Sequence, residues 1–367
     1  MILSVLFYVF VVFTAIQIIY YLAFSSFLFD NKKEKRKKVE IPISVIICAK
    51  NEADNLQKFL PSIINQKYSD FEIVLINDAS SDETSEVMQS FKKAHNNIKI
   101  IDVENIEAFW GNKKYALTLG IKAATHQHLL FIDADCKPLS KYWISEMSQN
   151  FSDEKTIILG YGKYKKEKLL VNLFVRFETL LTAIQYFSYA KLGSPYMAVG
   201  RNLAYNKDEF FNVKGFINHI HVKSGDDDLF IQDAANKENT SISLSKKSFT
   251  ESLAPKSFTE WFRQKRRHIS TANHYKTKHK FFLGLFYISK VFFYLLATTL
   301  FFYCSWKIIL PIVLSYYLTQ YLVVGFSAKK LNEPQVAYFL PFLEIGLMLF
   351  QLSIFIINLW SKPNHWK

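Results

Sequence analysis

Two short acidic segments contain residue types that could perform chemistry. Asp133 and Asp135 follow the apolar run 129–132, and residues 226–228 are three successive aspartates. Two carboxylates at positions i and i+2 just beyond a strand offer the oxygen ligands that a hard divalent ion such as Mg²⁺ or Mn²⁺ prefers. A carboxylate of the second segment could accept the proton of an attacking hydroxyl group. By residue type alone, solvated carboxylates of a turn are the competing explanation, so this interpretation depends on the elements that surround the two segments.

Short apolar strands must position these residues. From about residue 40 to residue 270 such strands alternate with helix-like segments, a pattern that favours a largely parallel sheet with crossover helices. The predicted strands are 43–48, 72–77, 98–103 and 128–133. Ligands of open parallel sheets bind beyond the carboxyl ends of the strands. We therefore expect Asn51, Glu52, Asp78, Asp133 and Asp135 to lie in one crevice.

The two ends of the chain are far more apolar than its middle. Residues 2–29 exceed the roughly 20 apolar residues that a helix needs to cross a bilayer, and the basic segment 32–38 follows directly. We predict an uncleaved membrane anchor over residues 1–30. A C-terminal membrane region of two to three helices is predicted over residues 281–360, from apolar runs at 281–306, 308–328 and 336–360.

The distribution of lysine and arginine predicts the orientation. Segments 32–38 and 263–280 and the pair Lys329-Lys330 can all be cytoplasmic if the chain crosses the membrane four times. The middle of the chain is then cytosolic, in a multi-pass protein of the plasma membrane. These clusters account for much of the net charge of +13, so we expect membrane lipids as partners and no nucleic acid.

Two polar features interrupt the apolar segments. Residues 169–190 are apolar enough to resemble a membrane span, but polar residues recur at helical spacing, which favours an interfacial or groove-lining helix. The stripe consists of Asn172, Arg176, Thr179, Thr182 and Gln185. Lys290 lies within the run 281–306, so that helix is expected either to place the lysine at the membrane interface or to face a protein-lined cavity.

The order of these motifs resembles that of family-2 glycosyltransferases with the GT-A fold, over about residues 43–268. The similar segments are 44–52, 74–82, 113–118, 133–135, 200–205, 224–229 and 264–268. The last resembles the Q-x-x-R-W motif of membrane-integrated members, with His268 in place of tryptophan. The resemblance implies an α/β fold of GT-A type, Rossmann-like and mostly parallel, joined to transmembrane helices.

The resemblance also implies roles for residues on the donor side. A nucleotide-sugar donor is expected to contact Ala49, Asn51, Glu52, Asp78, Lys113 and Asp133. Asp78 would accept a hydrogen bond from the nucleotide base. Asp133 and Asp135 would hold the Mg²⁺ or Mn²⁺ that neutralises the leaving diphosphate.

The acceptor side is implied by the later motifs. Asp227 is expected to be the general base, with Asp226 as the alternative because three successive aspartates leave the register ambiguous by one residue. A charged helix start is the competing structural explanation for these aspartates. The acceptor and the diphosphate would contact Asn202, Gln264, Arg267 and His268, although a basic cluster that meets lipid headgroups would also explain 263–280.

The predicted activity is that of an inverting, metal-dependent hexosyltransferase. It would move a sugar from a nucleotide-sugar, with UDP the commonest nucleotide in the family, to a lipid, lipid-linked or glycan acceptor at the cytoplasmic membrane face. A processive polysaccharide synthase is the enzymatic alternative. A catalytically silent membrane scaffold is the alternative from another class, although every acidic position that the mechanism needs is filled.

Overall fold

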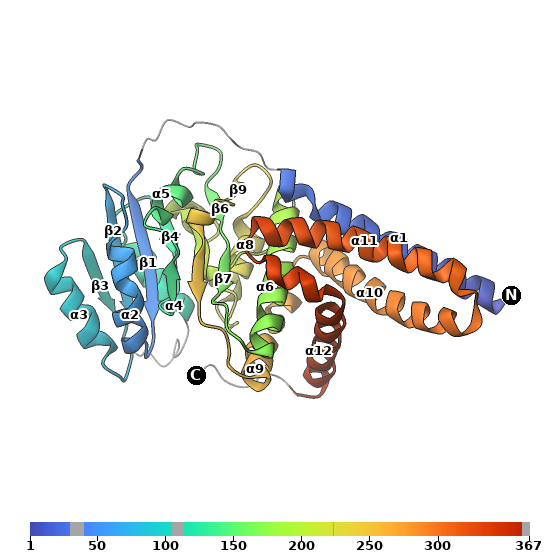
Figure 1. Ribbon diagram of the computed structural model, residues 1–367. Helices are drawn as coiled ribbons and strands as arrows, with labels where there is room; N and C mark the ends of the chain where they lie inside the picture. Colours follow the sequence, from blue (N-terminus) through green and yellow to red (C-terminus); the bar gives the residue numbers. More distant parts are fainter. Residues whose placement is uncertain (30–39, 105–112, 223, 362–367) are drawn as a thin grey trace.

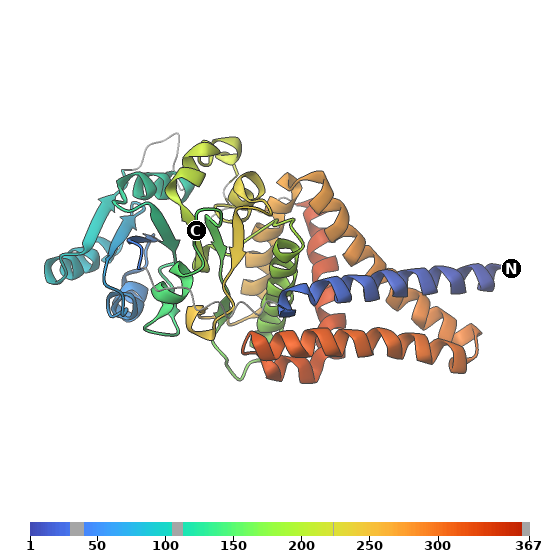
Figure 2. The same cartoon turned by 90° about the horizontal axis from the view of Figure 1, so that it is seen from above.

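The computed structural model describes residues 1–29, 40–104, 113–222 and 224–361 of the chain (Figure 1). An α/β domain forms one end of the molecule, and long helices extend from the other end (Figures 1 and 2). The basic segment 32–38, on which part of the predicted orientation depends, lies outside the described residues.

A seven-stranded sheet organises the α/β domain in the order β3-β2-β1-β4-β8-β6-β9. The first four strands in chain order are parallel, at Ile43–Ala49 (β1), Phe71–Asn77 (β2), Ile98–Asp102 (β3) and His128–Phe131 (β4). Strand β8 (Leu203–Asn206) is antiparallel to both β4 and β6 (Ile157–Leu159), and β6 pairs in parallel with β9 (Thr240–Ile242). The four predicted strands and the mostly parallel sheet are confirmed.

Helices cover both faces of this sheet, which explains why its central strands are buried along nearly their whole length. Alternate residues of β1 and β2 pack against α2 (Ala53–Ile64) and α3 (Thr84–Ala94) on one face, and against α4 (Lys113–Ala123) on the other. Gly120 allows α4 to approach closely, because a Cβ atom there would lie 2.1 Å from Ile76 Cδ1. The carboxyl ends of β1, β2 and β4 are thereby held at one edge.

Smaller elements complete the domain on the side toward the long helices. A three-stranded sheet has the order β5-β10-β7. Its strands are Cys136–Pro138 (β5), Thr250–Ser252 (β10) and Gly162–Tyr164 (β7). The remaining helices of the domain are α5 (Trp143–Ser148), α6 (Leu170–Lys191), α7 (Lys207–Asn212), α8 (Asp228–Ala234) and α9 (Phe258–Ile269).

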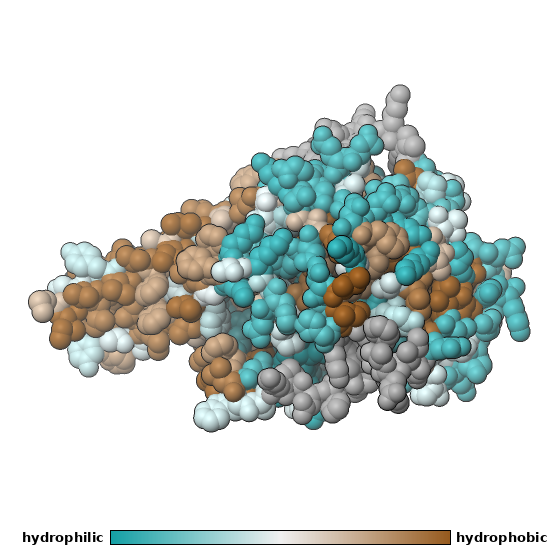
Figure 3. Space-filling model, turned by 180° about the vertical axis from the view of Figure 1, so that it is seen from behind, coloured by the Kyte–Doolittle hydropathy of each residue, from teal (hydrophilic) through white to brown (hydrophobic). Residues whose placement is uncertain are grey.

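Four helices in the described part of the chain are long and apolar enough to cross a membrane, at Ile2–Phe29, Thr277–Tyr303, Trp306–Lys330 and Pro334–Trp360. They contain α1 (Ile2–Phe24), α10 (Thr277–Tyr303), α11 (Trp306–Lys330) and α12 (Leu340–Trp360). Helices α1, α10 and α11 run side by side away from the domain, whereas α12 runs across their direction (Figures 1 and 2). Their surface is mostly hydrophobic, in contrast to that of the domain (Figure 3).

A buried polar cluster joins these four helices. Glu344 of α12 pairs with Lys290 of α10 at 2.8 Å and accepts hydrogen bonds from Tyr21, Tyr294 and Tyr316. Lys290 is only 6% exposed. This lysine therefore faces the protein interior, and its charge is compensated by a carboxylate in an apolar setting, where an unpaired charge is costly.

A second buried ion cluster fixes the segment between α11 and α12 to the α/β domain. Glu333 pairs with Lys163 of β7 at 2.9 Å and with Arg176 of α6, and Arg176 donates through its Nε at 2.9 Å. All three side chains are almost fully buried. The Lys163 and Arg176 charges therefore depend on Glu333 for compensation.

We expect Glu333→Ala to lower the free energy of unfolding by about 3–5 kcal/mol, because it leaves two cations buried without their carboxylate. Unfolding of the full chain in detergent, followed by tryptophan fluorescence against denaturant, measures this loss. Glu238→Ala, at an exposed position, is the matched control and should change little. Equal stability of the two variants would show that the cluster does not hold the domain to the helices.

Candidate active site

One cavity of about 1050 Å³ is lined by most of the site residues predicted from the sequence. It begins beyond the carboxyl ends of β1, β2 and β4 and continues to α10 and α12. Asn51, Glu52, Asp78, Asp133 and Asp135 all line it. The crevice expected from the strand order is therefore present, and it extends further toward the apolar helices than the sequence indicates.

Two strained loops form the wall beyond β1 and β2. Asn51 and Ala79 have φ values of 56° and 48°, a left-handed conformation that costs non-glycine residues about 1–3 kcal/mol. The loops hold each other in place, because the Asn51 N–H donates to Ser80 Oγ at 3.0 Å and Asn51 Oδ1 accepts from the Ser81 N–H at 2.8 Å. This strain presents Asn51 and Asp78 to the cavity.

Asp78 and Ala49 have different places in this wall. Asp78 lines the cavity; its burial raises the pKa of the carboxyl group, while the nearby Lys50 and Lys113 act in the opposite direction. Ala49 is buried and lies outside the cavity lining, and its carbonyl accepts from the Asp78 N–H at 2.9 Å. Ala49 therefore positions Asp78 and has no side-chain contact with the cavity.

Lys113 joins the two acidic segments. Its ammonium group lies 2.9 Å from Asp133 Oδ1 and 3.0 Å from Asp226 Oδ2. Burial lowers the pKa of Lys113, but Asp133 and Asp226 more than offset this effect and raise the pKa well above its usual range. The lysine is therefore a permanent cation at the centre of the site.

Asp133 and Asp135 form the part of the site that suits a metal ion. A carboxylate oxygen from each and the Cys136 sulfur lie within 4.8 Å of one another. Burial and the charge of Asp133 raise the pKa of Asp135, which is the effect of placing two carboxylates together without a cation. Burial also raises the pKa of Cys136, so its thiol stays protonated. The available donors are then oxygen atoms, which fit Mg²⁺ or Mn²⁺.

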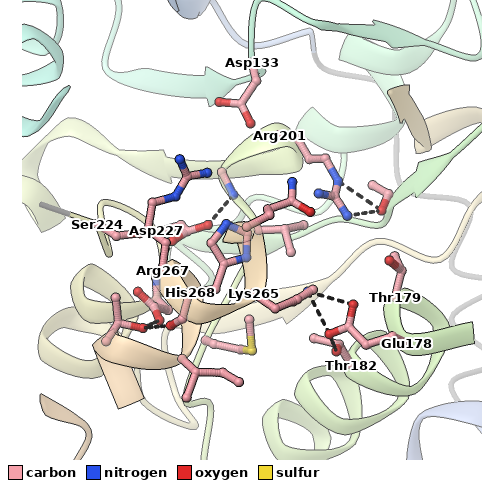
Figure 4. A pocket seen from close by; sticks show the side chains of 18 of the residues that line it. Asp133, Glu178, Thr179, Thr182, Arg201, Ser224, Asp227, Lys265, Arg267 and His268 are labelled. Carbon is pink, nitrogen blue, oxygen red and sulfur yellow. Dashed lines mark hydrogen bonds and ion pairs between the residues drawn. The ribbon is translucent and has the colours of Figure 1, made fainter. Parts of the chain in front are cut away.

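The three successive aspartates have separate partners. Asp226 pairs with Lys113, and Asp228 accepts hydrogen bonds from the hydroxyl groups of Thr271 (2.5 Å) and Tyr275 (2.6 Å). Within the described part of the chain, Asp227 accepts hydrogen bonds from the backbone N–H groups of Gly200 at 2.8 Å and Asp228 at 2.7 Å. It faces the cavity near Arg267 (Figure 4). Asp227 also caps the start of α8, so the structural explanation for this residue holds together with a chemical one.

Asn202 lies behind the cavity. It is fully buried, and its amide donates to the carbonyls of Tyr161 and Ser248 and accepts from Trp143 Nε1 at 3.0 Å. Because these contacts use both ends of the amide, Asn202 holds the turn that places Gly200 beside Asp227. It lies outside the cavity lining, so a direct contact with an acceptor is not available to it.

Helix α9 forms the opposite wall with Gln264, Lys265, Arg267 and His268, all of which line the cavity. Lys265 pairs with Glu178 of α6 at 2.7 Å (Figure 4). The helix start is fixed by Ser257, whose hydroxyl accepts from the Glu260 N–H. The cluster 264–268 therefore faces the cavity, and it also lies beside the long helices that could cross a membrane.

The polar stripe of α6 divides into two parts. Thr179, Thr182 and Gln185 line the cavity. Arg176 belongs to the Glu333 cluster, and Asn172 bonds to the loop before the helix. The helix is thus groove-lining over its second half only.

Glu178 and Arg201 also line the cavity, and the sequence predicts no role for either of them. Glu178 is the only acidic residue between 170 and 190, a signal that was available in the sequence. Arg201 donates to the Gly162 carbonyl at 2.8 Å, and its guanidinium lies 4.7 Å from the centre of the Tyr164 ring. No pattern in the sequence predicts the Arg201 contacts, because β7 is far away along the chain.

Comparisons with known proteins agree with this geometry. Residues 44–209 match the family Glycosyl transferase family 2. The chain carries a family 2 glycosyltransferase domain. Over 103 residues it is 37% identical to poly-β-1,6-N-acetyl-D-glucosamine synthase of Staphylococcus epidermidis, covering 28% of this chain and 24% of that protein. Over 120 residues it is 29% identical to glycosyltransferase AglE of Haloferax volcanii, covering 32% of this chain and 38% of that protein. The alignments thus span well under half of either relative.

A solved structure extends the likeness beyond the glycosyltransferase domain. The mannosyltransferase PcManGT from Pyrobaculum calidifontis, solved with GDP-Man and Mn²⁺, superposes with a TM-score of 0.61 over 99% of this chain and 100% of that chain. The sequence identity is 14%, so the likeness concerns the fold alone. It confirms the GT-A fold class and includes the long helices.

The glycosyltransferase domain is expected to show a pH dependence set by Asp227. Burial and the charges of Asp226 and Asp228 raise its pKa to about 8. A general base acts only when it is ionised, so kcat/KM should increase as the pH increases through this value and fall below it. Asp227→Asn should lower kcat by about 10²–10⁴-fold and abolish this pH dependence. A pH profile that is unchanged in Asp227→Asn would exclude Asp227 as the base.

Proposed function

We propose that the protein is an inverting, metal-dependent hexosyltransferase that moves a sugar from a nucleotide-sugar to a lipid or lipid-linked acceptor at the cytoplasmic face of the plasma membrane. The donor is expected to be a UDP-sugar from the family resemblance. A GDP-sugar is the other candidate, because PcManGT was solved with GDP-Man.

The continuity of the cavity is the observation that carries this proposal. At one end it is lined by the carboxylates Asp78, Asp133 and Asp135. At the other end apolar side chains of α10 and α12 line it, among them Leu283, Phe286, Leu347, Phe350 and Ile354. A nucleotide and a divalent cation suit the first end, and a hydrocarbon chain suits the second. A lipid acceptor would thus meet the donor between them.

The residues between the two ends support a single in-line displacement. The acceptor oxygen forms a bond to the anomeric carbon while the bond to the diphosphate oxygen breaks, and the diphosphate leaves with the electron pair. Asp227 takes the acceptor proton, and Asp78 accepts a hydrogen bond from the nucleotide base. Asp133 and Asp135 would hold the divalent cation, which would supply the positive charge that neutralises the diphosphate. Lys113 keeps Asp133 in place for this role.

Arg267, Gln264 and His268 would act at the junction of donor and acceptor. The forked guanidinium of Arg267 suits the diphosphate, and its partial burial strengthens such a contact. Gln264 donates weakly to the Tyr164 hydroxyl at 3.5 Å, and its buried amide oxygen has no hydrogen-bond donor among the described residues. We expect a bound acceptor hydroxyl to supply the missing donor.

A processive polysaccharide synthase is the second candidate, and the similarity to poly-β-1,6-N-acetyl-D-glucosamine synthase favours it. The two candidates differ in product length. A ladder of polymer would support the synthase, and one added sugar per acceptor would support single transfer.

The metal dependence can be tested with the donor alone. The full chain in lipid should release sugar from one member of a panel of UDP- and GDP-sugars only when Mn²⁺ or Mg²⁺ is present. Asp135→Asn should lose most of this activity, because one oxygen ligand becomes a neutral amide. Asp208→Asn, at an exposed position on α7, is the matched control and should retain it. Donor cleavage that is unchanged both without the cation and in Asp135→Asn would refute the proposed role of the metal ion.

The acceptor class can be tested by filling the apolar end of the cavity with a larger side chain. Leu283→Trp should raise KM for a lipid acceptor about tenfold, equivalent to about 1.4 kcal/mol, because the larger ring occupies the space of a hydrocarbon chain. Donor hydrolysis should not change. Leu295→Trp, on an exposed face of the same helix, should leave both reactions as they are. An unchanged KM in Leu283→Trp would argue against an acceptor at this end.

A further inference from the structure

Helix α12 has the length and composition of a membrane span, but both of its ends contact the catalytic domain. Before the helix, Glu333 is held by Lys163 and Arg176 of that domain. At its end, Arg266 of α9 donates to Asn358 Oδ1 at 2.7 Å and to the Ser361 carbonyl at 2.5 Å. The chain therefore enters and leaves α12 on the same side.

The middle of α12 also packs along the domain. The rings of Phe342 and Phe174 are 5.5 Å apart, and those of Phe350 and Trp261 stack at 3.9 Å. Gly346 allows α6 to approach closely, since a Cβ atom there would lie 2.6 Å from Phe174 Cε1. Successive turns of α12 thus follow the surface formed by α6 and α9.

A crossing helix could not make these contacts. The 21 residues of α12 extend about 30 Å, which equals the hydrocarbon thickness of a bilayer. If α12 crossed, its far end would lie on the side of the membrane opposite the domain. Both views instead show α12 running across the direction of α1, α10 and α11 (Figures 1 and 2).

The face of α12 that points away from the domain is apolar. Leu349, Ile356 and Leu359 are 55%, 46% and 70% exposed. Large aromatic residues stand near the two ends, Tyr338 before the helix and Trp360 at its last position, and both are highly exposed. An apolar face bounded by aromatic residues is typical of a helix at the headgroup boundary. This face adjoins the membrane helices, so the bilayer is the partner that fits it.

We propose that α12 lies in the plane of the membrane on the catalytic side, with its outer face in the boundary between headgroups and acyl chains. Only α1, α10 and α11 then cross. The basic segment 263–280, the pair Lys329-Lys330 and the end of α12 all lie on one side, so the orientation expected from the positive charges does not need a fourth crossing. This topology does not depend on the proposed chemistry.

Cysteine labelling of the full chain tests this topology. In a background with Cys48, Cys136 and Cys304 replaced by alanine, single cysteines are introduced by Ser90→Cys, Ser305→Cys and Ser361→Cys. All three positions are exposed. Ser90 reports the catalytic side on α3, and Ser305 reports the opposite side between α10 and α11. A membrane-impermeant maleimide is applied to intact cells and to inside-out vesicles.

Ser361→Cys should label in the same preparation as Ser90→Cys and fail to label in the preparation that labels Ser305→Cys. Labelling of Ser361→Cys together with Ser305→Cys would show that α12 crosses, and it would overturn the proposal. If the cysteine-free background does not fold, a fluorescent protein fused after residue 367 of the unmodified chain answers the same question. Fluorescence is expected for the in-plane helix, since the reporter matures in the cytoplasm, and its loss would contradict the proposal.

Discussion

The ammonium group of Lys113 lies between the carboxylates of Asp133 and Asp226, and both halves of the cavity depend on this contact. Asp133 follows β4 in the parallel part of the sheet, whereas Asp226 precedes α8. Without a cation between them, these two carboxylates and their acidic neighbours would repel one another in a partly buried site. Lys113 therefore allows the domain to concentrate negative charge at the place where the proposed function requires a metal ion and a diphosphate to bind.

A second constraint is that this charged site must open toward an apolar region. Helices α6 and α9 solve this problem by turning polar residues toward the cavity and apolar residues toward α12. Across the gap between the two helices, Lys265 of α9 pairs with Glu178 of α6 at 2.7 Å. The stacked rings of Trp261 and Phe350 continue the same surface into the long helices. The cavity thus changes from polar to apolar along its length, from the carboxylates beyond the sheet to the side chains of α10 and α12.

Much of the domain could be predicted from the sequence because its signals are local. Strands β1 to β4 are short apolar runs, and Asp78 and Asp133 follow directly from the ends of two of them. The roles of other residues depend on partners far away along the chain. Asn202 belongs to a segment similar to an acceptor-side motif, yet its amide is used by Trp143, Tyr161 and Ser248. The three aspartates 226–228 are distinguishable only by their partners, which the sequence does not reveal.

The direction of α12 shows the same limit. Hydropathy reports the composition of a helix and gives no information on the direction of its axis. The composition of 336–360 therefore predicts a membrane span, although contacts with Phe174, Trp261 and Arg266 place this helix along the domain. The expectation for Lys290 was closer to the structure, because a charge in an apolar run must face a partner, and Glu344 supplies it.

The most direct test of the central claim follows the transferred sugar. Full-length protein in vesicles of total membrane lipid is incubated with Mn²⁺ and an isotope-labelled donor, and the products are divided between organic solvent and water. The account predicts that the label enters the organic phase, on a lipid carrying one added sugar, and that Asp227→Asn abolishes this product. Label that appears only in water-soluble polymer, or no transfer to lipid by an enzyme that still cleaves the donor, would contradict it.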